Sequence, residues 1–116
     1  MNAKYVAGLC LGALLLVAGC AAKPLPTPQI ESLGQVCDRL APLKDATPQT
    51  RDEEDEYLRV LGNARAKSSG EITGAIIGVQ DYSMEAFKEN PDQALLDELR
   101  PDYERGTARM AQLCAW

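Results

Sequence analysis

An uncharged apolar run near the N-terminus constrains this chain most, because it decides which residues belong to the folded domain. The run extends from Tyr5 to Ala18 directly after Lys4, and it contains no charged side chain. A helix that crosses the roughly 30 Å core of a bilayer needs about 20 apolar residues, and this run is shorter. A cationic start followed by a short apolar run is typical of a cleaved secretory signal. A buried N-terminal helix and a retained membrane anchor are the two alternatives.

The residues that end this run indicate the kind of signal. Leu16-Val17-Ala18-Gly19-Cys20 places aliphatic and then small residues directly before a cysteine. The pattern resembles the lipobox of bacterial lipoprotein precursors, with valine where that family most often has leucine three residues before the cysteine. The resemblance covers the leader only. It implies that a diacylglycerol is attached to the sulfur of Cys20 and that cleavage falls between Gly19 and Cys20.

The remaining chain then divides into a tether and one domain. Residues 1–19 form the predicted signal peptide, residues 20–28 a lipidated N-terminus with a proline-rich tether, and residues 29–116 the folded body. Three prolines between Ala21 and Pro28 favour an extended spacer. The chain has 17 acidic and 12 basic residues, and only one charge, Lys4, lies in the leader. We therefore expect the lipid to anchor the protein at the extracytoplasmic face of a membrane, and we expect no nucleic-acid partner.

From residue 29 onward the apolar residues recur at helical intervals, which predicts an all-α bundle. A first helix, capped by Thr27, ends before Pro42. A second helix begins at the capping box Thr50 to Glu53. The first helix would bury one face, formed by Ile30, Leu33, Cys37 and Leu40.

Two further helix starts follow, and each leaves an alternative open. Ser68 to Glu71 is a second candidate capping box, although residues 72–79 also fit a strand. Asn90 and Pro91 predict the start of a last helix, which Pro101 either kinks or divides. The sequence thus predicts four short helices, or five. The residues expected to face inward in these helices include Ile72, Ala75, Ile76, Val79, Met84, Phe87, Ala94, Leu95, Leu96, Leu99, Tyr103, Thr107 and Met110.

The cysteines predict one cross-link. Cys10 lies in the leader and Cys20 would carry the lipid, which leaves Cys37 and Cys114. Exported proteins meet an oxidising environment, and two thiols allow a single pairing. We expect a disulfide that joins the first helix to the last, and the alternative is two free buried thiols.

The composition leaves little for catalysis. The chain has no histidine, so it lacks the usual general base and metal ligand as well as the base of a Ser-His or Cys-His pair. The acidic run from Asp52 to Glu56 is best explained as a solvated helix N-terminus, because consecutive helical residues point around the whole cylinder. We expect no catalytic residue, no metal site and no cofactor other than the lipid on Cys20.

A repeated glycine is the strongest candidate for an interaction face. Gly70, Gly74 and Gly78 recur every four residues, and on a helix they would form a smooth stripe that another backbone can approach. Close packing inside the same bundle is the simpler explanation, and docking of a partner is the more specific one. We add Ile77 and Trp116 to this candidate face, with Trp116 either an exposed tip or a lid over the core.

These observations predict a non-enzymatic, membrane-anchored lipoprotein that binds another protein at the cell envelope. One version is a prophage-encoded factor that excludes a second phage by binding an envelope or phage component. The alternative is a carrier of a lipid or small molecule, with an apolar cavity around Ile76, Val79 and Phe87.

Overall fold

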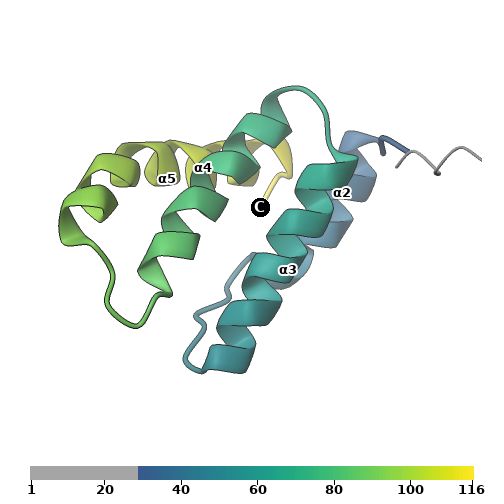
Figure 1. The fold of residues 1–116 in the computed structure, drawn as a ribbon. Helices are drawn as coiled ribbons and strands as arrows, with labels where there is room; N and C mark the ends of the chain where they lie inside the picture. Colours follow the sequence, from purple (N-terminus) through teal and green to yellow (C-terminus); the bar gives the residue numbers. More distant parts are fainter. Residues whose placement is uncertain (1–28) are drawn as a thin grey trace, which may run out of the picture.

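The computed structural model describes residues 29–116, and the leader and tether, including Cys20, lie outside the described residues. In these residues all regular secondary structure is helical and there is no strand, which confirms the all-α prediction (Figure 1). The elements are α2 (Leu33–Leu40), a 3₁₀ helix η1 (Ala41–Leu43), α3 (Arg51–Lys67), α4 (Glu71–Ala86) and α5 (Gln93–Leu113).

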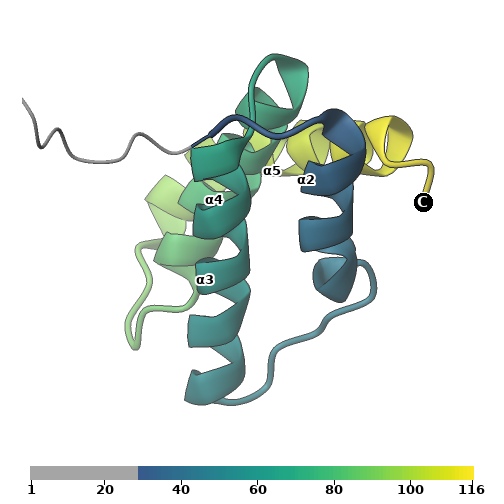
Figure 2. The ribbon, with the colours of Figure 1, turned by 90° about the vertical axis from the view of Figure 1, so that its right-hand side faces the viewer.

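The helices pack in chain order around one core. α2 lies beside α3, α3 packs against α4, and α4 makes its most extensive contacts with α5. Figure 2 shows α5 running across the bundle, at a steep angle to α2 and α3. The core between them is aliphatic and comes from every element: Val36, Leu40, Leu43, Val60, Leu61, Ala64, Ile72, Ala75, Ile76, Val79 and Met110.

The first helix begins later than the sequence predicted. Ser32 caps α2 in a capping box with Gln35: the Ser32 side chain accepts from the Gln35 N–H, and the Gln35 side-chain oxygen accepts from the Ser32 N–H. The prediction of a first helix that includes residue 30 is therefore wrong. The predicted inward face is also wrong at Ile30 and Leu33, which are 58% and 43% exposed, and Val36 takes that place in the core.

The start of α4 also differs from the prediction, because Gly70 and not Ser68 is its N-cap. Gly70 has a φ of +78°, a conformation that L side chains rarely adopt. The Ser68 hydroxyl instead donates to the Arg65 carbonyl at 3.0 Å, at the end of α3. Residues 72–79 are helical, so the open choice between helix and strand is resolved.

The last helix is continuous, so the described chain contains four α-helices rather than five. Pro101 lies inside α5 at an exposed position, where the loss of one backbone hydrogen bond leaves a carbonyl that water can reach. The cap is Asp92, whose carboxylate accepts from the Leu95 N–H at 3.2 Å, and not Asn90. Three residues predicted to face inward in α4 and α5 are exposed instead: Met84, Ala94 and Thr107.

Candidate interaction surfaces

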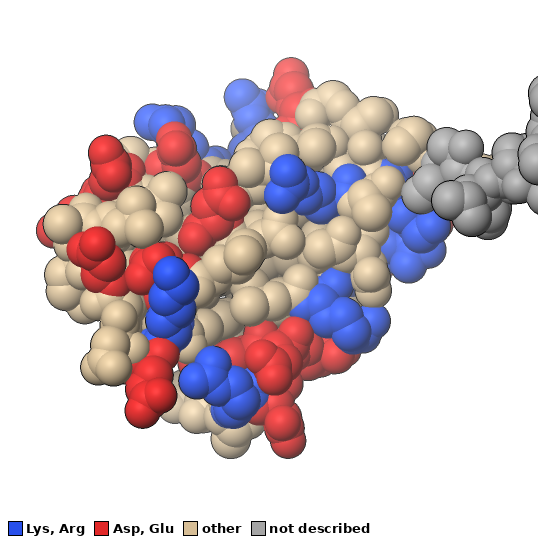
Figure 3. All heavy atoms as spheres, viewed as in Figure 1, with Lys and Arg blue, Asp and Glu red and all other residues tan. Residues whose placement is uncertain are grey.

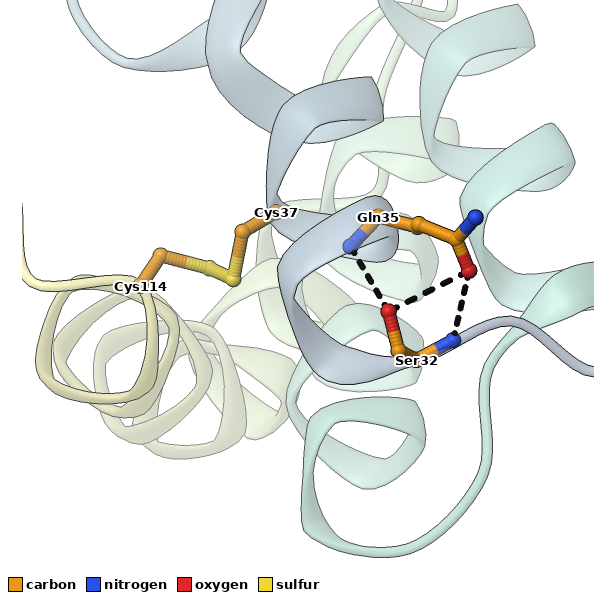
Figure 4. The surroundings of a disulfide bond; sticks show 4 residues. All are labelled: Ser32, Gln35, Cys37 and Cys114. Atoms are coloured by element: carbon orange, nitrogen blue, oxygen red, sulfur yellow. Dashed lines mark hydrogen bonds between the residues drawn. A yellow bond between two sulfur atoms is a disulfide. The ribbon is translucent and has the colours of Figure 1, made fainter.

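The predicted disulfide is present. Cys37 in α2 is bonded to Cys114 directly after α5, with the two Cα atoms 5.4 Å apart (Figure 4). The bond spans 77 residues and joins the first helix to the end of the last. It confirms the pairing expected from the cysteines that remain once Cys10 and Cys20 are set aside.

α4 and α5 cross at close range because each presents a glycine to the backbone of the other. A Cβ placed on Gly78 would lie 2.6 Å from the Asp102 carbonyl oxygen, and one on Gly106 would lie 2.5 Å from the Ala75 carbonyl oxygen. Neither position has room for a side chain. Packing within the bundle therefore accounts for Gly78, and Gly106 is its counterpart, which the sequence pattern did not indicate.

The glycine repeat thus has three separate roles rather than one shared surface. Gly70 supplies the positive φ of a cap, Gly78 is buried under α5, and only Gly74 lies on the open side of α4, where an added Cβ would meet nothing within 4 Å. Ile77, one residue before Gly78, is half-buried. Of the predicted face, Gly70 and Gly74 are exposed and Ile77 is half-buried, and of these Gly74 and Ile77 lie between α4 and α5.

These two residues lie in a groove between α4 and α5, here called the α4–α5 groove, with a volume of about 670 Å³. Small residues form its floor, and charged side chains form its rim. Arg105 pairs with Asp102 across one turn, and Arg109 lies 3.6 Å from Glu71 on the facing helix. The other lining residues are Gly74, Ala75, Ile77, Gly78, Asp81, Leu99, Gly106, Ala108 and Gln112.

Trp116 lies on a different part of the molecule from this groove. It packs against the core and borders a cavity of about 280 Å³ together with Leu43, Tyr57 and Met110. Its backbone N–H donates to the Ala111 carbonyl at 2.9 Å, which continues the end of α5. The structure therefore places Trp116 as a lid over the core and does not bring it together with Gly74 and Ile77.

Two of the three residues proposed to line a carrier cavity, Ile76 and Val79, belong to the core, and Phe87 does not. Ile76 is fully buried and Val79 is 1% exposed, and both pack within the aliphatic cluster. Phe87 lies at the end of α4, where its ring meets Tyr57 edge to face at 5.7 Å between centroids.

An aromatic cluster beside the groove was not predicted from the sequence. Tyr82 of α4 stacks on Tyr103 of α5 with 4.3 Å between ring centroids. The Arg100 guanidinium lies 5.7 Å from the Tyr82 ring centroid and donates to the Tyr82 hydroxyl at 3.2 Å. Each tyrosine follows an aspartate in the sequence, but only the crossing of α4 and α5 brings the two rings together.

The turn between α4 and α5 is held by a buried glutamate. Glu85 is 6% exposed; its carboxylate accepts from the Asp92 N–H at 2.9 Å and from the Lys88 ammonium at 2.8 Å. The Asp92 N–H, followed by Lys88, holds the pKa of Glu85 below its ordinary value. This carboxylate ties the end of α4 to the start of α5.

Within residues 29–116, no helix has the length and apolar character needed to cross a bilayer. The same residues contain no group of three or more cysteine, aspartate or glutamate side chains arranged to hold a metal ion. No family model, no curated protein and no solved structure matches this chain.

Proposed function

We propose that this protein is a lipoprotein anchored through Cys20 at the extracytoplasmic face of a membrane, where its helical body binds another protein without catalysing a reaction. The proposal rests on the pairing of the cysteines. The resemblance of Leu16 to Cys20 to a lipobox implies that one sulfur carries the lipid, and the two cysteines of the body form a disulfide with each other. Disulfides persist in exported proteins and are rare in the cytosol.

The α4–α5 groove is the binding surface in this proposal. Gly74 leaves backbone accessible on its floor, and Ile77 and Leu99 add half-buried apolar area. A ring of both charge signs around an apolar floor suits a helical or extended protein segment, which needs complementary charges to set its register. Exclusion of a second phage, by capture of an envelope or phage component, is one form of this activity.

The anchor is tested by labelling cells that produce the full chain with a radioactive fatty acid. The wild type should incorporate label and have an intact mass that lacks residues 1–19. The Cys20→Ala variant should incorporate none. An unlabelled wild type whose mass still includes Met1 would exclude the proposal.

The groove is tested with a photo-crosslinking amino acid in place of Ile77 in the lipidated protein. We expect one discrete crosslinked envelope protein, and we expect Gly74→Gln to remove it by filling the groove. Gly34→Gln is the matched control, because Gly34 is also an exposed helical glycine with nothing within 4 Å of an added Cβ. Equal crosslinking in both variants would contradict the assignment of the groove. A small molecule retained in native mass spectrometry would favour the carrier alternative.

A further inference from the structure

The chain carries exposed apolar side chains at the point where it enters the fold. Ile30 is 58% exposed and Leu33 is 43% exposed, and they lie ten and thirteen residues after Cys20. Single exposed apolar residues are ordinary on protein surfaces. Two of them close together, directly after the tether, form a small apolar patch at one end of the body.

Two cations act on Glu31, which lies between these two apolar residues in the sequence. The Glu31 N–H donates to the Lys67 carbonyl at 2.8 Å, which fixes the start of the fold beside the end of α3. The Arg39 guanidinium donates twice to the Glu31 carboxylate, at 2.5 and 2.8 Å. Arg39, and more weakly the charge of Lys67, hold the pKa of Glu31 below its ordinary value. Glu31 is thus flanked by two cations, Arg39 and Lys67.

The opposite end of α3 has the reverse charge. Asp52, Glu53 and Glu54 occupy its first turn, whereas Arg65 and Lys67 occupy its last. A helix of 17 residues is about 25 Å long. Figure 3, in the view of Figure 1, shows basic side chains at the right-hand side of the described residues, where α2 begins, and most acidic side chains on the left and at the bottom. The net charge of the full chain is −5, and without Lys4 of the leader the acidic excess is larger, but this charge is unevenly distributed along α3.

We propose that Ile30, Leu33, Arg39 and Lys67, here called the tether-end surface, dock the body on the anionic lipid bilayer that holds Cys20. The inference rests on the proposed lipid anchor. The ten residues from Cys20 to Ile30 reach at most about 35 Å, so the surface stays close to the bilayer. Attachment through the lipid makes docking intramolecular, so a small apolar and basic patch is sufficient. Docking directs the acidic end of α3 away from the membrane.

The experiment uses Trp116, the only tryptophan of the chain, as a fluorescent donor. The disulfide holds the segment that carries Trp116 beside α2. The lipidated full-length protein is reconstituted in vesicles of phosphatidylcholine and phosphatidylglycerol that contain dansyl-phosphatidylethanolamine as acceptor. We expect strong energy transfer in the wild type. In the double variant Ile30→Ser/Leu33→Ser, transfer should fall about twofold, because binding to an interface scales with the apolar area inserted.

The matched control is Met84→Ser, which removes an equally exposed apolar side chain (53%) from α4. It should transfer energy like the wild type. Lys67→Gln should lower transfer in vesicles with phosphatidylglycerol but not in pure phosphatidylcholine. Equal transfer in the wild type and the double variant, with both floating with the vesicles, would overturn docking while leaving the anchor intact. A wild type that carries no acyl chain and does not float would instead overturn the anchor.

Discussion

The α4–α5 pair and α2 are attached to the same bundle by different means. α4 and α5 have 16 and 21 residues and cross with glycine against backbone at two points. α2 has eight residues, of which only Val36 and Leu40 are buried, and it carries the disulfide and a capping box. One region is held by its length and close packing, and the other by a covalent bond and local hydrogen bonds.

The difference follows from the free energy of helix formation. A helix of eight residues is unstable alone, because nucleation costs more than so few hydrogen bonds return. Two buried aliphatic side chains contribute about 3–6 kcal/mol at most. α4 buries Ile72, Ala75, Ile76 and Val79, and α5 packs against it at the two glycine contacts. We therefore expect α2 and the α4–α5 pair to respond differently to the same perturbation.

The largest expected effect is on α2, from removal of the disulfide. Cys37→Ala/Cys114→Ala should lower the free energy of unfolding by about 4 kcal/mol, from the entropy of a 77-residue loop in the unfolded chain. A domain of this size has little more than that in total. Urea denaturation followed by circular dichroism measures the change.

Hydrogen exchange in the same variant sharpens the comparison. Amides of α2 should lose protection first, and those at the α4–α5 crossing last. Reduction of the wild type should reproduce the pattern. Uniform loss of protection across all helices would show that the disulfide stabilises the whole bundle and not α2 in particular.

The second prediction concerns the glycine crossing. Gly106→Ala places a Cβ 2.5 Å from the Ala75 carbonyl oxygen, so α5 must move away from α4. Overpacking of this kind should cost about 1–3 kcal/mol, measured by urea denaturation. Gly74→Ala is the matched control, because its Cβ meets nothing within 4 Å and alanine favours a helix by about 1 kcal/mol over glycine. If both variants have equal stability, the crossing is not tightly packed.

Features that depend on local sequence or on composition are predicted well. The disulfide followed from counting cysteines, and the start of α3 followed from the capping box Thr50 to Glu53, in which the Thr50 hydroxyl accepts from the Glu53 N–H at 3.2 Å. The first signal depends only on the number of cysteines, and the second is contained in four consecutive residues. The all-α class followed from the helical spacing of the apolar residues, which is also a local feature of the sequence.

The features that the sequence did not predict depend on which elements meet. The close contact of Gly106 with Ala75 exists only because α5 crosses α4, and the same crossing stacks Tyr82 on Tyr103. The exact starts of α2 and α4 depended on a choice between neighbouring capping signals. At α4, Gly70 is the cap because the chain needs a positive φ there, and no local pattern distinguishes that requirement from a serine cap.

A third prediction compares the two capping boxes. Ser32→Ala and Thr50→Ala each remove one side-chain acceptor from a helix N-terminus, and each should cost about 1 kcal/mol. The two substitutions should differ in which amides lose protection from hydrogen exchange. Loss of Ser32 should expose the amides of α2 to hydrogen exchange, whereas the 17 residues of α3 should stay protected after loss of Thr50. Equal local effects would mean that α2 is no more dependent on its cap than α3.

The smallest expected effect is at the turn between α4 and α5, where a charge takes part in the packing. Because the pKa of Glu85 is lowered in the fold, its contribution to stability is fully present above the ordinary pKa of a glutamate and is lost as pH falls through the lowered value. Glu85→Gln should therefore be less stable than the wild type at neutral pH, and the two should converge in acid. Urea midpoints across this pH range measure the difference.

The control for this last test is Glu89→Gln, an exposed glutamate a few residues further along the same segment. The pKa values of Glu31 and Glu53 are also lowered, by Arg39 and by the backbone N–H of Gln49 respectively, so both variants retain some pH dependence. Only the pH dependence of stability that is lost in Glu85→Gln is due to the turn. If Glu85→Gln and Glu89→Gln follow the same curve, packing alone holds α4 to α5, and the contrast with α2 becomes stronger.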